Sequence, residues 1–166
     1  MDNIFYDENN KFQIDLSAAQ KPLGNLHSKF KSIGNIISDV DWIAETDDEV
    51  ILIEFKNYEE KEHIPEGNEV GSTYQKYARK YYGSVFYYLS CGNQKPFDYV
   101  VVLESPHMDN VVRNWYRNSI MKLLPFKLQE MSEIAIPLIR NFQVMSVSEW
   151  NKLYPQYPIR KKSINQ

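Results

Sequence analysis

The strongest constraint on the fold is a pair of apolar segments, 36–45 and 50–56, separated by four polar residues. Alternating side chains and β-branched residues predict that both segments are strands. The residues between them, Thr46–Glu49, are of the short polar kind that tight turns favour. If the chain folds back at the centre of this turn, the resulting hairpin register places Asp41 directly opposite Glu54.

The two faces of this predicted hairpin differ in polarity, because side chains alternate along a strand. One face is uniformly apolar and is expected to pack on a layer of helices; it comprises Val40, Trp42, Ala44, Ile51, Ile53 and Phe55. The other face carries Asp41, Glu54 and Lys56 at its far end. Two opposed carboxylates repel at a cost of about 0.2–1 kcal/mol. A hairpin shaped by stability alone would avoid this pair, whereas a site for a divalent cation requires it.

Asp39 is the alternative to Asp41, since it lies on the same face of the predicted strand. In the hairpin register Asp39 opposes Lys56, an arrangement that also suits an ordinary cross-strand ion pair. We favour Asp41 as a metal ligand because Asp41 is the residue that faces Glu54.

The composition is that of a globular protein with a single domain. The chain has 166 residues, of which 43% are hydrophobic and 25% charged. No apolar run reaches the ~18 residues of a membrane span, and no signal peptide is visible at the N-terminus. A lone cysteine, Cys91, excludes an internal disulfide and a thiolate metal cluster, so we expect a cytoplasmic protein without a membrane partner. A net charge of −3 argues against a protein that coats nucleic acid non-specifically. It is compatible with a nuclease, because the site of a nuclease is acidic.

The rest of the sequence predicts an α/β fold with a mixed central sheet flanked by helices. Further strands are expected at 11–16, 97–104 and 141–147, and helices at 17–30, 72–89, 110–124 and 148–154. The segment 97–104 is apolar almost throughout, which suits a strand covered on both sides. We expect one domain over 1–166, with its core at about 12–104 and a C-terminal helix–strand–helix extension at about 105–156.

The predicted helix at 72–89 has an apolar stripe for the core and a neighbouring face that carries Gln75 and Arg79. Ser72 is expected to cap its N-terminus. The polar segment before it, 57–71, would be a loop of unusual length for a compact domain, which makes it a candidate lid. Arg160–Lys162 are expected to lie in a solvated tail.

The order of these features resembles the PD-(D/E)XK nuclease superfamily, which includes restriction endonucleases and archaeal Holliday junction resolvases. The pattern Glu-x-Lys occurs by chance in most proteins. Here, however, it lies at the end of an apolar strand, and the preceding strand of the hairpin carries an acidic residue, Asp41, opposite the glutamate. Asp41 matches the first acidic residue of the family, Glu54 the second and Lys56 the lysine. Gln75 lies in the helix where several branches carry a glutamine. The resemblance covers about 36–104 and implies a restriction-endonuclease-like core.

The resemblance further implies a deoxyribonuclease that depends on Mg²⁺ or Mn²⁺, with RNA as a less favoured substrate. Magnesium takes oxygen ligands and binds through one or two carboxylates plus a substrate phosphate. Asp41 and Glu54, with the main-chain carbonyl of Phe55, would hold the ion, which would lower the pKa of a bound water. Lys56 would position or deprotonate that water, or balance the charge that develops on phosphorus. Gln75 would orient a water or contact the nucleic acid backbone.

One departure from the family pattern keeps a second hypothesis open. Many members carry an acidic residue in the helix before the hairpin, and the segment 17–30 contains no Asp or Glu. His27 is a candidate replacement and His107 a candidate to reach the site, although both, like His63, are more simply surface histidines. A chain that kept the fold without catalysis would be a module that binds nucleic acid or a protein partner. Small members of the superfamily often dimerise, so the resemblance is compatible with a homodimer or with a complex with a partner subunit.

Overall fold

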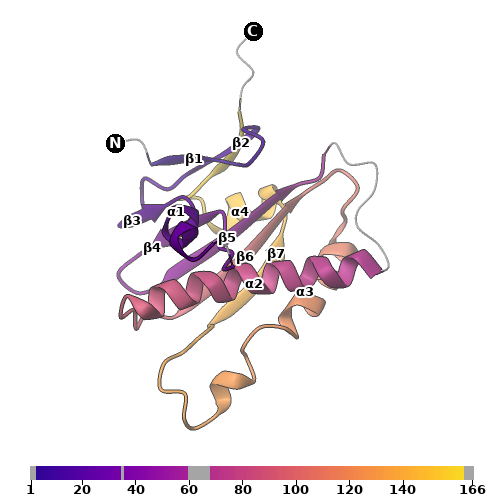
Figure 1. Cartoon of the computed structure of the whole chain (residues 1–166). Coiled ribbons are helices and arrows are strands. Elements are labelled where there is room, and N and C mark those ends of the chain that lie inside the picture. The colour runs from indigo at the N-terminus through magenta and orange to yellow at the C-terminus, as the bar shows by residue number, and fades with distance from the viewer. Residues whose placement is uncertain (1–2, 35, 60–67, 163–166) are drawn as a thin grey trace.

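The structure is a computed structural model that describes residues 3–34, 36–59 and 68–162, and its fold is mixed α/β (Figure 1). The strands are β1 (Ile4–Tyr6), β2 (Phe12–Asp15), β3 (Lys21–Leu23), β4 (Trp42–Glu45), β5 (Val50–Asn57), β6 (Phe97–Glu104), β7 (Asn141–Met145) and β8 (Ile159–Lys161). The helices are α1 (His27–Phe30), α2 (Asn68–Ser90), α3 (Asn110–Met121) and α4 (Val147–Leu153), with 3-10 turns η1 (Lys31–Ile33) and η2 (Leu128–Glu130). Among the described residues, no helix is long and apolar enough to cross a membrane.

The central sheet has five strands in the order β3-β4-β5-β6-β7, and a smaller sheet has the order β1-β2-β8. In the central sheet, β3, β4 and β5 pair antiparallel, whereas β5, β6 and β7 pair parallel. The parallel pairing of β5 with β6 needs a crossover connection, which contains α2. The strand predicted at 97–104 is confirmed as β6, and its place between two other strands explains its apolar sequence. Because β7 belongs to the extension predicted at 105–156, that extension completes the central sheet.

The hairpin register predicted from the sequence is confirmed. The paired residues of β4 and β5 are Trp42 with Ile53, Ile43 with Leu52, Ala44 with Ile51 and Glu45 with Val50. The first strand is shorter than predicted, since β4 begins at Trp42 rather than at residue 36. The chain therefore reaches Asp41 as a loop and not as part of the sheet.

Two apolar clusters lie on opposite faces of the central sheet. The first contains Ile43 and Leu52 and is covered by α1, α2 and α3. The second contains Trp42 and Ile53 and packs against β2, β8 and α4. The expectation that this second face packs on helices is thus only partly right, because the smaller sheet supplies much of its cover. Val40 lies in the first cluster rather than the second, since strand alternation does not extend back to it.

Three further predictions are wrong in whole or in part. The helix predicted at 17–30 is replaced by β3 and the short α1, and Pro22 lies in β3 because an edge strand tolerates a residue without an N–H. Arg160–Lys162 are exposed as predicted but do not form a tail, since β8 pairs with β2. Ser72 does not cap α2, because the helix already includes Asn68.

The segment before β4 is held against α2 by an approach that only glycine permits. A Cβ atom on Gly83 would lie 1.9 Å from the main-chain oxygen of Ser38. The hydroxyl of the next residue, Ser84, accepts a hydrogen bond from the main-chain N of Val40 at 3.1 Å. These two contacts fix the part of the chain that leads into Asp41.

Gly83→Ala is therefore expected to destabilise the protein by about 1–3 kcal/mol, the usual cost of overpacking a close contact. Gly71→Ala is the matched control, because it lies in the same helix and no atom lies within 4 Å of the added Cβ. At that position alanine should stabilise the helix by about 0.5–1 kcal/mol. Urea unfolding followed by circular dichroism measures both changes. A Gly83→Ala midpoint at or above the wild-type value would contradict the packing of this segment on α2.

Candidate active site

Asp41 and Glu54 come together at the open end of the hairpin. Glu54 lies in β5, and its side chain is completely buried. Asp41 lies one residue before β4, and its Oδ2 accepts a hydrogen bond from the main-chain N of Phe55 at 2.9 Å. This bond extends the association of the two segments beyond the last strand pair. It also holds the Asp41 carboxylate beside that of Glu54.

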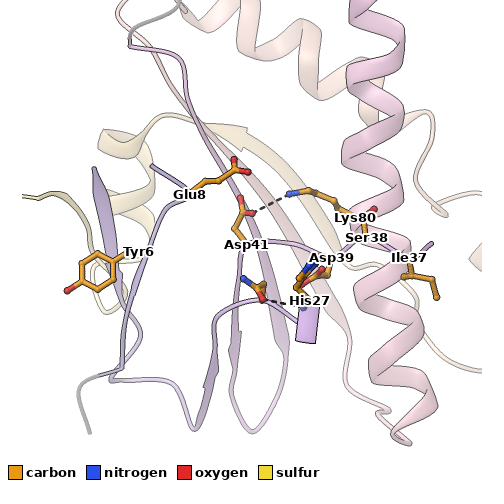
Figure 2. A pocket seen from close by; sticks show the side chains of 9 residues that line it. Tyr6, Glu8, His27, Ile37, Ser38, Asp39, Asp41 and Lys80 are labelled. Atoms are coloured by element: carbon orange, nitrogen blue, oxygen red, sulfur yellow. Dashed lines mark hydrogen bonds and ion pairs between the residues drawn. The ribbon is translucent and has the colours of Figure 1, made fainter. Parts of the chain in front are cut away.

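A lysine of α2 that the sequence analysis did not single out joins these two carboxylates. The Nζ atom of Lys80 lies 2.8 Å from both carboxylate oxygens of Glu54 and 3.3 Å from Oδ1 of Asp41. Figure 2 shows the Lys80 side chain extending from α2 toward Asp41. The sequence does contain one indication that Lys80 faces the sheet. Lys80 lies between Tyr77 and Tyr81, which are both buried and turn this part of α2 toward the sheet.

Lys56 lies on another side of Glu54. Its Nζ is 3.6 Å from Oε1 of Glu54 and 3.5 Å from Oε2 of Glu8, which lies in the turn between β1 and β2. Asp39 does not form the cross-strand pair with Lys56 that the register suggested, because the ladder ends before it. The Asp39 carboxylate instead accepts a hydrogen bond from the main-chain N of Leu26.

Burial and the charges of neighbouring side chains together set the pKa values in this group. Burial, followed by the charge of Asp41, raises the pKa of Glu54 to about 8, despite the opposing effect of two nearby lysines. Burial also acts to lower the pKa of Lys80, but the Glu54 and Asp41 carboxylates outweigh it and raise that pKa. The pKa of Lys56 is raised against the effect of burial in the same way. Both lysines therefore keep their positive charge at neutral pH.

Two cavities meet at Lys80. The first has a volume of about 490 Å³ and is rich in lysine; the charged residues that line it are Glu8, Glu54, Lys56, Lys76 and Lys80. The second has a volume of about 380 Å³ and is richer in carboxylates; the residues with ionisable side chains that line it are Tyr6, Glu8, His27, Asp39, Asp41 and Lys80 (Figure 2). Lys80 and Glu8 thus line both the lysine-rich cavity and the carboxylate-rich one.

The other candidates named from the sequence lie in different places. Gln75 and Arg79 are exposed on α2 and, among the described residues, are not part of the lining of either cavity. His27 lines the second cavity, and its main-chain N donates to Oδ1 of Asn25. His107 is exposed in the turn after β6.

His63 and residues 60–67 of the predicted loop at 57–71 lie outside the described residues. The described part of that segment consists of the end of β5, the two residues after it and the first residues of α2.

The two carboxylates are arranged to share one cation, which is the requirement for a divalent metal. Asp41 and Glu54 converge on the single ammonium of Lys80, and Mg²⁺ binds in proteins through as few as one or two carboxylates with waters and a phosphate. No group of three or more His, Cys, Asp or Glu side chains suited to a metal is found in the described part of the chain. The Phe55 ring packs on the far face of the sheet, 5.1 Å from that of Trp42, so Phe55 can offer only its main chain.

Comparison with known proteins adds no relative: no protein family model, curated protein or solved structure matches this chain. The resemblance to the PD-(D/E)XK superfamily thus depends on Asp41, Glu54 and Lys56 and on the elements that carry them. The function of the chain has to be argued from this geometry.

Lys80→Met is expected to destabilise the protein, because it removes the nearest counter-charge of a buried carboxylate. Breaking such a pair costs about 3–5 kcal/mol, and proton uptake by Glu54 should reduce that cost at low pH. Wild-type stability should already fall as the pH rises from about 4.5 to about 8, because Glu54 with its raised pKa holds a proton that the unfolded chain has released. Without Lys80 the pKa of Glu54 rises further, so the stability of Lys80→Met should fall more and over a wider range. Urea unfolding across this range measures the slope.

Two variants control this experiment. Adding Glu54→Gln to Lys80→Met should remove most of the pH dependence, since the amide does not titrate. Lys76→Met, at an exposed position one turn earlier in α2, should change stability by no more than about 0.5 kcal/mol. A Lys80→Met protein as stable as wild type at every pH would contradict the buried ion pair.

Proposed function

We propose that this chain is a nuclease that depends on a divalent cation and hydrolyses phosphodiester bonds in DNA. The observation that carries the proposal is the convergence of the Asp41 and Glu54 carboxylates on one cationic position beside Lys56. The hairpin, the helix α2 and the buried strand β6 follow one another in the order that the PD-(D/E)XK resemblance implies. A restriction-endonuclease-like core is part of this proposal.

Asp41 and Glu54 would hold Mg²⁺ or Mn²⁺, with the main-chain carbonyl of Phe55 as a further ligand. When bound, the ion would polarise the scissile phosphate and lower the pKa of a coordinated water. Lys56 has a raised pKa and stays protonated, which suits it to stabilise the charge that develops on the phosphate. The same raised pKa argues against Lys56 as the base that deprotonates the water.

The lysine-lined cavity supports a phosphate-rich polymer as the substrate. Lys56, Lys76 and Lys80 all line it, and contacts between cations and phosphates supply much of the affinity for nucleic acids. The net charge of the chain is −3 and would repel DNA. The attraction for DNA must therefore come from this local group of lysines. Gln75 lies outside both cavities, so we assign it contact with the nucleic acid backbone and not the orientation of a water.

A second function is favoured by one observation, which is that Lys80 already pairs with both carboxylates. A chain that kept this fold without catalysis would bind nucleic acid or a protein partner through the same cavity. Binding of Mn²⁺ separates the two functions, because the binding module has no need of a metal.

The purified protein is expected to cleave supercoiled plasmid or single-stranded DNA with Mg²⁺ or Mn²⁺, and to stop when EDTA is added. Glu54→Gln removes a metal ligand and Lys56→Met removes a charge that stabilises the transition state. Each should lower the single-turnover rate by at least about 100-fold, the usual loss for such a group. Gel electrophoresis of the products measures the rate.

Glu133→Gln and Lys152→Met repeat these two substitutions at exposed positions and serve as matched controls. Both should leave the rate within about twofold of wild type, because exposed substitutions of this kind are close to neutral. Protein that binds no Mn²⁺ and cleaves neither DNA would favour the binding module. Cleavage that survives Glu54→Gln would rule out this site as the centre of the activity.

A further inference from the structure

Lys80 occupies the place at which Asp41 and Glu54 would share a metal. Its ammonium lies within hydrogen-bond distance of three carboxylate oxygens, two from Glu54 and one from Asp41. A divalent cation held by Asp41 and Glu54 would need the carboxylate oxygens to which the ammonium now donates. The ammonium and the ion therefore exclude each other.

We propose that Lys80 is a built-in counter-ion that has to leave these carboxylates before a divalent cation binds, so that the chain limits its own affinity for metal. The proposal rests on the metal-dependent function proposed above. Without a cation near it, the fully buried Glu54 carboxylate would face the charge of Asp41 with only Lys56, 3.6 Å away, to compensate. Lys80 supplies the missing charge when no metal is bound.

The surroundings of Lys80 allow its ammonium to leave without any movement of the backbone. The side chain is 22% exposed and borders both cavities, so there is open space on either side of it. A lysine has a flexible stem of four carbons that permits such a rotation. The main chain stays in place, because the Lys80 carbonyl accepts a hydrogen bond from the hydroxyl of Ser84 at 3.0 Å inside α2.

A displaced Lys80 could contribute to the binding of a substrate phosphate. In the first cavity its ammonium would join Lys56 and Lys76, where a substrate phosphate is expected. The residue that opposes the metal in the free protein would then bind substrate in the loaded one. Lys56 cannot play this part, since its contacts are with Glu54 and with Glu8 and it does not bridge the two ligand carboxylates.

The test is the affinity of purified protein for Mn²⁺, measured by isothermal titration calorimetry without nucleic acid. Lys80→Met should bind Mn²⁺ at least about tenfold more tightly than wild type, because the competing charge is gone. Lys80→Arg keeps the charge and should bind no more tightly than wild type. Lys76→Met removes a nearby charge that does not touch the carboxylates, so its affinity should change far less than that of Lys80→Met.

Lys80→Gln and thermal unfolding keep the test decisive if Lys80→Met folds poorly. Each metal-free variant should gain stability as Mn²⁺ is added, and the gain should exceed that of wild type at equal Mn²⁺. Adding Glu54→Gln to either variant should abolish this gain, which would place the ion at the two carboxylates. A gain that persists with Glu54→Gln would place the ion elsewhere and overturn the proposal.

The failure of this proposal is distinguishable from failure of the proposed function. Wild-type protein that binds Mn²⁺ as tightly as Lys80→Met and Lys80→Gln would overturn the competition and leave the nuclease in place. Tight binding by these variants in a chain that never cleaves DNA would support the competition and overturn the nuclease. Absence of Mn²⁺ binding in every variant would overturn both.

Discussion

The burial of the Glu54 carboxylate is the constraint on which the rest of the site depends. A charge taken out of water costs several kcal/mol unless it is paired, and β5 places this one beside the second carboxylate of Asp41. Lys56 alone, at 3.6 Å, is too distant to satisfy both oxygens of Glu54. The chain therefore needs a cation from a second element, and α2 provides Lys80 at 2.8 Å.

A single turn of α2 sets both the shape and the charge of the site. Gly83 allows the segment before β4 to lie against the helix, and Ser84 accepts the main-chain hydrogen bond of Val40. Lys80, one turn earlier, contacts the carboxylate of Asp41, which that same segment delivers. The loop and the helix thus position each other, and the ion pair forms between side chains whose backbones are already fixed.

The register that brings Asp41 to Glu54 could be predicted, because alternation and a four-residue turn leave few other pairings. The position of Lys80 between Tyr77 and Tyr81 indicates that it lies near the sheet, but the sequence does not predict its pairing with Asp41 and Glu54, since the rotation of the helix on the sheet is not known from it. The family pattern points to Gln75, which lies five residues away and thus about 140° around the helix axis. The sequence does not predict the edge strand β3 for a related reason: Pro22 argues against regular structure, and only the pairing with β4 makes this segment a strand.

The formal charges of the site explain why metal and nucleic acid should favour each other. When both carboxylates are ionised, Asp41 and Glu54 balance Lys56 and Lys80; because the pKa of Glu54 is raised to about 8, a proton on Glu54 leaves the metal-free group positive at neutral pH. A divalent cation would leave two surplus positive charges in a partly buried space where charges are poorly screened. A lysine that moves toward an entering phosphate reduces that surplus, whereas one that stays at the carboxylates opposes the ion. Phosphates of a nucleic acid would therefore stabilise the metal-bound state, and the metal would free a cation to hold them.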